Sequence, residues 1–161
     1  LSDFYVSYKV EIGDVMAITT AVCNTFKTGL LAASFNFTQT TGNAFKIALY
    51  TSSATINRDT TEYTTGNEVA SGGKYTTGGK SLAIGSQTYT LKTSTACVDF
   101  ANVTWETSTI TARGALIYND TVSGDPAVCA LNFGGDKTST SGTFTIQFPD
   151  LTDTEAIIRI A

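Results

Sequence analysis

The stretch that decides the fold is residues 103–133, VTWETSTITARGALIYNDTVSGDPAVCALNF. It holds three runs rich in β-branched and aromatic residues, Val103–Glu106, Thr109–Tyr118 and Ala127–Phe133, which Gly, Asn, Asp and Ser separate. Short runs of this composition between turn-forming residues are typical of β-strands. Six further runs elsewhere in the chain predict strands for the same reason: 45–49, 81–84, 88–92, 96–100, 143–148 and 156–160.

Nine such runs predict an all-β fold. No segment with helical periodicity lies between them, which excludes alternating βαβ units and favours an antiparallel β-sandwich of the jelly-roll or immunoglobulin-like kind. At 161 residues the chain is long enough for one domain with its own core. We therefore expect residues 16–161 to form a single β-sandwich domain.

One helix is expected before the strands, over residues 16–33. Ile18, Val22, Phe26 and Leu30 recur at four-residue spacing within it, as on one face of an amphipathic helix. Several threonines and a glycine lower the helix propensity of this segment. The helix therefore needs packing against the rest of the protein to persist.

The first fifteen residues, LSDFYVSYKVEIGDV, precede the only methionine, Met16. The codons ATA-GGA-GAT can encode Ile12-Gly13-Asp14, and they contain a bacterial ribosome-binding sequence shortly before the Met16 codon. We expect residues 1–15 to be a translated upstream extension. The alternative is that they form a genuine N-terminal strand.

The composition excludes several classes of function. Only 15% of the residues are charged, the net charge is −4 and there is no histidine. The commonest general base, the Ser-His-Asp and Cys-His systems and imidazole metal ligands are therefore absent. The ten Lys and Arg residues are scattered and the pI is about 4.6, so no nucleic-acid partner is expected. No apolar run reaches the roughly 18–20 residues that cross a bilayer, so no membrane partner is expected either.

Three cysteines, Cys23, Cys97 and Cys129, are widely spaced and form no CxxC pair. This pattern predicts neither a zinc site nor a disulfide framework. We interpret them as small buried apolar residues, with a disulfide between Cys97 and Cys129 as the alternative.

Two short motifs resemble binding loops without meeting their requirements. Residues 73–81, GKYTTGGKS, end like a phosphate-binding loop, but the leading glycine is one position too far away. Such a loop also needs a helix directly after it, whereas residues 82–84 are predicted as a strand. The acidic loop Asn119–Asp125 fits no established calcium loop and is interpreted as a turn whose side chains bond their own backbone.

The remaining candidate residues also have ordinary structural explanations. Asp99, Glu106, Asp136 and Asp150 are interpreted as surface and turn acids, because nothing in the sequence places a pair of them across a cleft. Trp105 is interpreted as a core residue. The alternative is a glycan-binding face, to which Trp105 would contribute with the tyrosines at positions 63, 75 and 89. We predict no catalytic, cofactor-binding or metal-binding residues.

Several blocks, read together, resemble a family of small structural-type proteins of tailed bacteriophages. The resemblance covers about residues 16–161 and is most specific in 109–119, TITARGALIYN, and 131–149, which begins LNFGGDKTS. Further matching blocks are 45–52, 67–69, 73–75, 78–79, 103–105 and 157–161.

This resemblance implies a non-enzymatic component of the virion. The expected role is head decoration or a part of the tail or its fibre, acting through self-assembly and contacts with other virion proteins. Synthesis would take place in the bacterial host cytoplasm. The resemblance supplies no site residues and no cofactor. The alternative role is a host-surface glycan-binding module displayed on the same particle.

Overall fold

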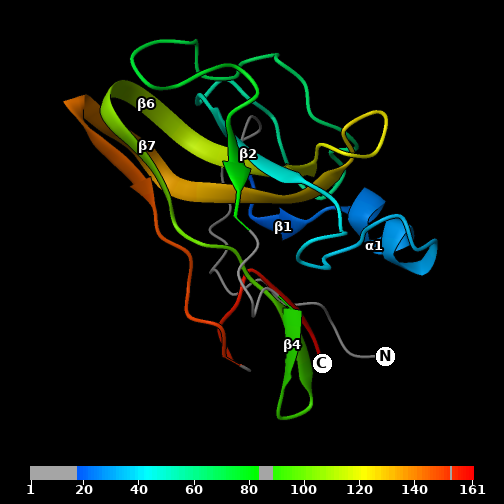
Figure 1. Cartoon of the computed structure of the whole chain (residues 1–161). Helices are drawn as coiled ribbons and strands as arrows, with labels where there is room; N and C mark the ends of the chain where they lie inside the picture. Colours follow the sequence, from blue (N-terminus) through cyan, green and yellow to red (C-terminus); the bar gives the residue numbers. More distant parts are fainter. Residues whose placement is uncertain (1–17, 84–88, 153) are drawn as a thin grey trace.

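A computed structural model describes residues 18–83, 89–152 and 154–161 (Figure 1). All strand pairs are antiparallel, in a five-stranded sheet of order β1-β7-β6-β2-β3 and a three-stranded sheet of order β4-β5-β8. The all-β architecture with one short helix, predicted as a β-sandwich, is confirmed. The elements are β1 (Ala21–Val22), α1 (Asn24–Leu31), β2 (Phe45–Tyr50), β3 (Lys80–Leu82), β4 (Tyr89–Lys92), β5 (Thr95–Val98), β6 (Val103–Asn119), β7 (Ala127–Ile146) and β8 (Ile158–Ile160).

Strands β6 and β7 form one long antiparallel ribbon, with register from Val103 opposite Ile146 to Tyr118 opposite Ala127. The sequence predicted two separate runs within each of them. The breaks are irregularities inside continuous strands, because Thr107 and Ser141 adopt positive φ angles without ending the pairing. The Ser108 hydroxyl stabilises the first irregularity by donating a hydrogen bond to the Trp105 carbonyl oxygen at 3.0 Å.

Strand β2 lies between two apolar clusters. Phe45, Ile47 and Leu49 belong to the larger cluster on one face of the sheet, and Ala48 and Tyr50 belong to a smaller cluster on the other. In the sequence, Phe45, Ile47 and Leu49 alternate with Lys46 and Ala48, which predicts a strand buried on one face only. That prediction is wrong because the segment around Ala54, Ile56 and Tyr63 covers the second face.

The helix is shorter than the predicted span of residues 16–33. Within the described part of that span, Ala21 and Val22 pair with Ala130 and Cys129 as strand β1, and α1 covers only Asn24–Leu31. Pairing with β7 satisfies backbone groups that a helix would have to satisfy internally. The four-residue spacing corresponds to a helix only around Phe26, which is the buried residue of α1.

The predicted extension, residues 1–15, lies outside the described residues. Parts of two predicted strands, residues 84 and 88, also lie outside them. Within the described ranges, no helix has the length and apolar character needed to span a bilayer.

Gly79 gives a direct test of how the 70–79 loop approaches strand β2. Its φ is +72°, and a Cβ placed there would lie 1.9 Å from the Ile47 carbonyl oxygen. We expect Gly79→Ala to lower the free energy of unfolding by at least about 2 kcal/mol. The control Gly72→Ala adds a Cβ with nothing within 4 Å and should change the value by about 0.5 kcal/mol or less. Equal effects of both variants in urea unfolding would contradict this packing.

Candidate functional site

The phosphate-loop-like segment is part of a sheet. Lys80–Leu82 forms strand β3, which pairs with β2. The Lys80 ammonium group donates a hydrogen bond to the Thr104 carbonyl oxygen at 2.7 Å. A strand thus directly follows Gly78 and Gly79, as the sequence predicted for this segment, in the place where a phosphate-binding loop needs the start of a helix.

The acidic loop after β6 is a turn held by its own side chains. Asn119 is fully buried, and its side-chain oxygen accepts hydrogen bonds from the backbone N–H groups of Thr121 and Val122. Asp120 forms an ion pair with Lys46 at 3.0 Å. Among the described residues there is no group of three or more metal-ligating side chains. The loop is therefore a structural turn, as predicted.

The three aromatic side chains of the proposed glycan face that the structure describes do not form an exposed platform. Trp105 and Tyr75 are each 2% exposed and lie in the larger core cluster. Tyr63 is half-buried and stacks on Tyr118 with ring centroids 4.6 Å apart. The side chain of Tyr89 lies outside the described part. The interpretation of Trp105 as a core residue is confirmed.

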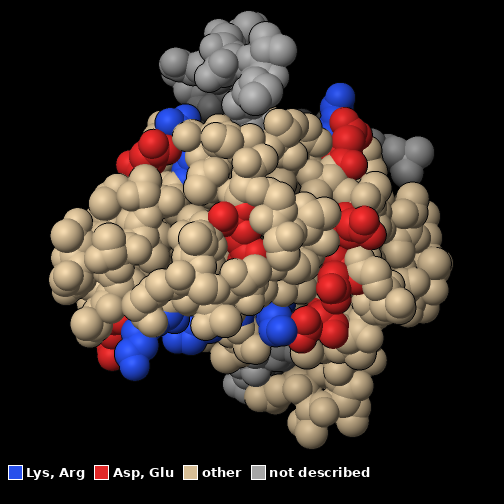
Figure 2. All heavy atoms as spheres, turned by 90° about the horizontal axis from the view of Figure 1, so that it is seen from above, with Lys and Arg blue, Asp and Glu red and all other residues tan. Residues whose placement is uncertain are grey.

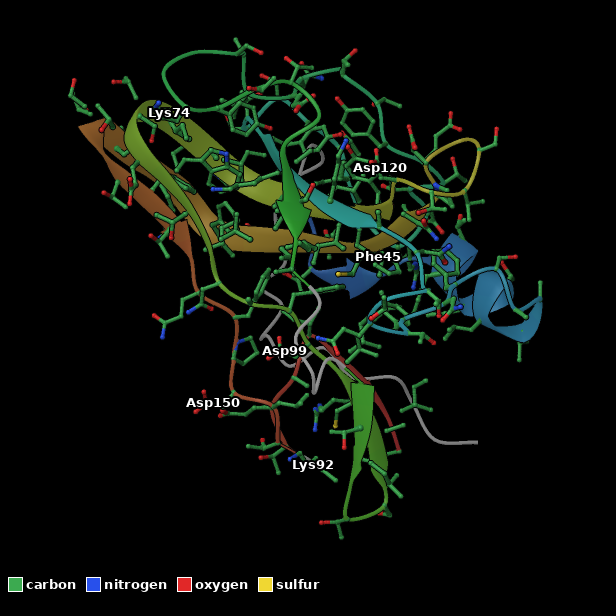
Figure 3. All side chains as sticks on the ribbon, in the orientation of Figure 1. Phe45, Lys74, Lys92, Asp99, Asp120 and Asp150 are labelled. Carbon is green, nitrogen blue, oxygen red and sulfur yellow. The ribbon has the colours of Figure 1, made fainter. Side chains whose placement is uncertain are left out.

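The four acids considered as catalytic candidates lie in different surroundings. Asp136 pairs with Arg113 at 2.7 Å, and Glu106 is exposed on β6. Asp99 and Asp150 lie on segments that flank the small sheet (Figure 3). Burial raises the pKa of the half-buried Asp99, the N–H of Phe100 lowers it, and the charge of Asp150 raises it further. This is the single pair among the four that the described structure brings together.

All three cysteines are buried thiols that form no disulfide. Burial raises the pKa of Cys23 to about 12, and it also raises the pKa of Cys129. The prediction of small buried apolar residues is confirmed, and the alternative disulfide is absent.

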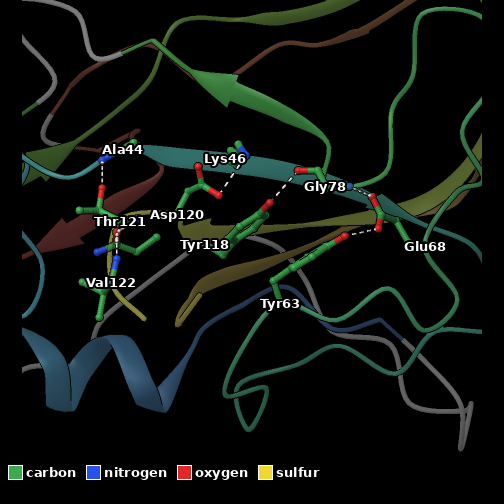
Figure 4. A network of polar contacts seen from close by, with 10 residues as sticks. Ala44, Lys46, Tyr63, Glu68, Gly78, Tyr118, Asp120, Thr121 and Val122 are labelled. Atoms are coloured by element: carbon green, nitrogen blue, oxygen red, sulfur yellow. Dashed lines mark hydrogen bonds and ion pairs between the residues drawn. The ribbon is translucent and has the colours of Figure 1, made fainter. Parts of the chain in front are cut away.

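A polar network around Glu68 was missed by the sequence analysis (Figure 4). One carboxylate oxygen accepts hydrogen bonds from the Tyr75 hydroxyl at 2.7 Å and the Gly78 N–H at 2.8 Å. The other accepts a bond from the Tyr63 hydroxyl at 2.5 Å. The Tyr118 hydroxyl donates to the Gly78 carbonyl oxygen at 2.7 Å. The network thus ties the 62–79 segment to the central sheet.

The network has structural rather than catalytic character. Burial raises the pKa of Tyr63 and Tyr75, and the hydrogen bond and charge of Glu68 raise both further. These phenols therefore remain protonated donors at physiological pH. The Tyr75 hydroxyl also accepts the N–H of Leu49 at 2.8 Å, so both of its bonding roles are used within the fold.

A groove runs along strand β7, with a volume of about 800 Å³. On one side lies β7, and on the other lies the segment 154–159 before and within β8. Apolar residues that line the groove include Leu131, Phe133 and Ile157. The charged residues in its lining are Lys137, Glu155 and Arg159. On the face drawn in Figure 2, broad uncharged areas separate the charged side chains. We name this cavity the β7 groove.

Strand β7 also presents backbone groups beside the β7 groove. On the side away from β6, its neighbour is β1, which pairs only with Cys129 and Ala130. The last part of β7 lies at the outer margin of the molecule (Figure 1). Among the described residues, no strand pairs with this margin over residues 143–146. A strand edge that no described strand pairs with, beside a groove of mixed apolar and polar lining, can accept another strand.

Comparison with protein-family models, curated protein sequences and solved structures finds no match to this chain.

Glu68 is expected to stabilise the fold through its three donors. We expect Glu68→Ala to lower the free energy of unfolding by about 2–3 kcal/mol, because it leaves buried donors without an acceptor. Glu68→Gln retains part of the bonding and should cost less. Glu62→Ala, which removes an exposed glutamate of the same segment, serves as the control. A loss for Glu68→Ala no larger than that control, measured by urea unfolding, would contradict the role of the network.

The raised pKa of Asp99 predicts a pH-dependent effect of substitution. Because its pKa is higher in the folded than in the unfolded chain, the contribution of Asp99 to stability falls as pH rises through the folded pKa. An asparagine side chain at this position would retain an acceptor for the Phe100 N–H, which Asp99 binds at 2.8 Å. We therefore expect Asp99→Asn to be more stable than the wild type at pH 7, with a smaller advantage at pH 3. An equal difference in urea unfolding at both pH values would refute the explanation.

Proposed function

We propose that this chain is a non-enzymatic structural protein of a bacteriophage virion. It would decorate the head or belong to the tail or its fibre, and it would act by binding copies of itself and other virion proteins. The observation that carries the proposal is the unpaired edge of β7 beside the β7 groove. A surface of this kind is suited to assembly through backbone hydrogen bonds and apolar contacts.

The distribution of chemical groups supports the same proposal. The Glu68 network is closed on itself by internal hydrogen bonds. Neither Asp99 nor Asp150 lines the β7 groove. The groove offers apolar and hydroxyl side chains with three charged residues, Lys137, Glu155 and Arg159, a lining suited to binding a partner by shape and hydrogen bonds. The resemblance to phage structural proteins supplies the biological setting of the proposal.

The glycan-binding alternative draws no support from the described aromatic residues. Stacking on a sugar ring needs exposed aromatic faces, whereas Trp105 and Tyr75 are in the core. We therefore keep assembly as the proposed function.

Quantitative mass spectrometry of purified phage particles tests this proposal. We expect the chain to copurify with the particles, at a copy number close to that of the major capsid protein for a decoration protein. A few copies per particle would indicate the tail or fibre. Absence of the chain from particles, with its recovery only in the soluble lysate of the infected host, would overturn the proposal.

A further inference from the structure

The outward backbone groups of β7 can be assigned from its pairing. Phe148 N–H donates to the Asn102 side-chain oxygen on the β6 side at 2.9 Å. Neighbouring residues of an antiparallel strand direct their N–H and C=O groups to opposite sides. The backbone groups of Phe144 and Ile146 therefore face β6, and those of Thr145 and Gln147 face the outer margin.

Over residues 138–147 this margin carries neither charge nor proline, two of the features that usually prevent edge strands from pairing. Residues 138–147, TSTSGTFTIQ, contain no charged residue and no proline. Edge strands of monomeric proteins are commonly protected by lysine, proline or a bulge. Strand β7 is irregular at Ser141, whose N–H donates a hydrogen bond to the Thr109 hydroxyl at 3.0 Å. This irregularity divides the edge of β7 into two parts. The part that follows, Thr143–Gln147, has the length of an ordinary strand.

We infer that Thr143–Gln147 pairs antiparallel with the same segment of a second copy, with Thr145 opposite Thr145 at a two-fold axis. This inference rests on the proposed self-assembly and specifies its contact. Antiparallel pairing of two identical edges is self-complementary under two-fold symmetry. Thr145, at the centre of the segment, is exposed.

A second copy is the occupant favoured by charge and by side-chain alternation. Each chain carries a net charge of −4, so two copies approach best through an uncharged segment. In this register the partner's Phe144 and Ile146 lie on the same face as Phe144 and Ile146 of the first copy. Both residues line the β7 groove. The paired sheets would thus extend the apolar lining of each groove.

Charge substitutions at Thr145 test the contact by sedimentation velocity over a range of concentrations. We expect the wild type to dimerise, and Thr145→Lys and Thr145→Glu each to raise the dissociation constant about tenfold or more, because like charges face each other at the axis. Mixing the two variants should restore dimers. Wild-type chain that stays monomeric, or a mixture that restores nothing, would overturn the inference.

Thr104→Lys is the matched control. Thr104 lies opposite Thr145 on β6, and their hydroxyls are 3.1 Å apart. Both lysine variants lose that contact and add one positive charge, but only Thr145 belongs to the proposed interface. Thr104→Lys should dimerise like the wild type, and equal weakening by both lysine variants would overturn the inference.

A cysteine at the axis gives a second measurement that does not depend on weakening the fold. Opposed residues of an antiparallel pair have Cα atoms about 4.5–5.5 Å apart, within the range of a disulfide. Thr145→Cys should form a covalent dimer on oxidation. Thr104→Cys should not, because three strand spacings, about 14 Å, separate the two copies of that position. The native cysteines are buried.

These experiments separate the interface from the proposed function. If the chain is present in particles but Thr145→Cys does not cross-link, the inference is wrong and the virion role stands. If the dimer forms through Thr145 but the chain is absent from particles, the virion role is wrong and the interface stands.

Discussion

The antiparallel pairing of β6 with β7 is the constraint on which the rest of the structure depends. Strand β2 pairs with one half of β6, and β1 pairs with a short part of β7. The other half of the ribbon has no further strand beside it in the described sheet. On its buried face, Trp105 of β6 and Phe144 of β7 contact each other, and Tyr75 packs against Trp105 from outside the ribbon. The same ribbon therefore supplies the core on one face and an open edge at its margin.

Hydroxyl groups form many of the side-chain contacts that charged groups form in other small domains. Thr104 and Thr145 meet across the ribbon, and Thr111 and Thr138 meet in the same way. The 62–79 segment is held by tyrosine hydroxyls that converge on Glu68. Every buried side-chain nitrogen or oxygen in the described part has a hydrogen-bond partner. This arrangement explains how a threonine-rich chain with few charges stabilises a β fold, and it leaves parts of the surface uncharged.

The strands could be predicted from composition because β-branched and aromatic runs fit a pleated, half-buried surface. Their continuity could not, since Thr107 and Ser141 look like turn residues and yet lie inside β6 and β7. The predicted helix was too long because four-residue spacing does not reveal that Ala21–Val22 has a strand partner. Glu68 was missed because its donors, Tyr63, Tyr75 and Gly78, lie 5, 7 and 10 residues away in an irregular segment whose folding follows neither a strand nor a helix period. The one feature of the sequence that could have indicated the role of Glu68 was its position as an isolated acidic residue directly before Val69, which is buried. The uncharged run 138–147 is visible in the sequence, but only the topology shows that it is an edge.

The central claim is that the margin of β7 is a self-association surface, and backbone amide hydrogen exchange followed by NMR tests it most directly. The N–H groups of Thr145 and Gln147 face outward, and no strand within residues 18–83, 89–152 and 154–161 pairs with them. Our account predicts that both exchange slowly in concentrated protein and rapidly on dilution, while the inward N–H of Ile146 stays protected throughout. Rapid exchange of Thr145 and Gln147 at every concentration would contradict the account.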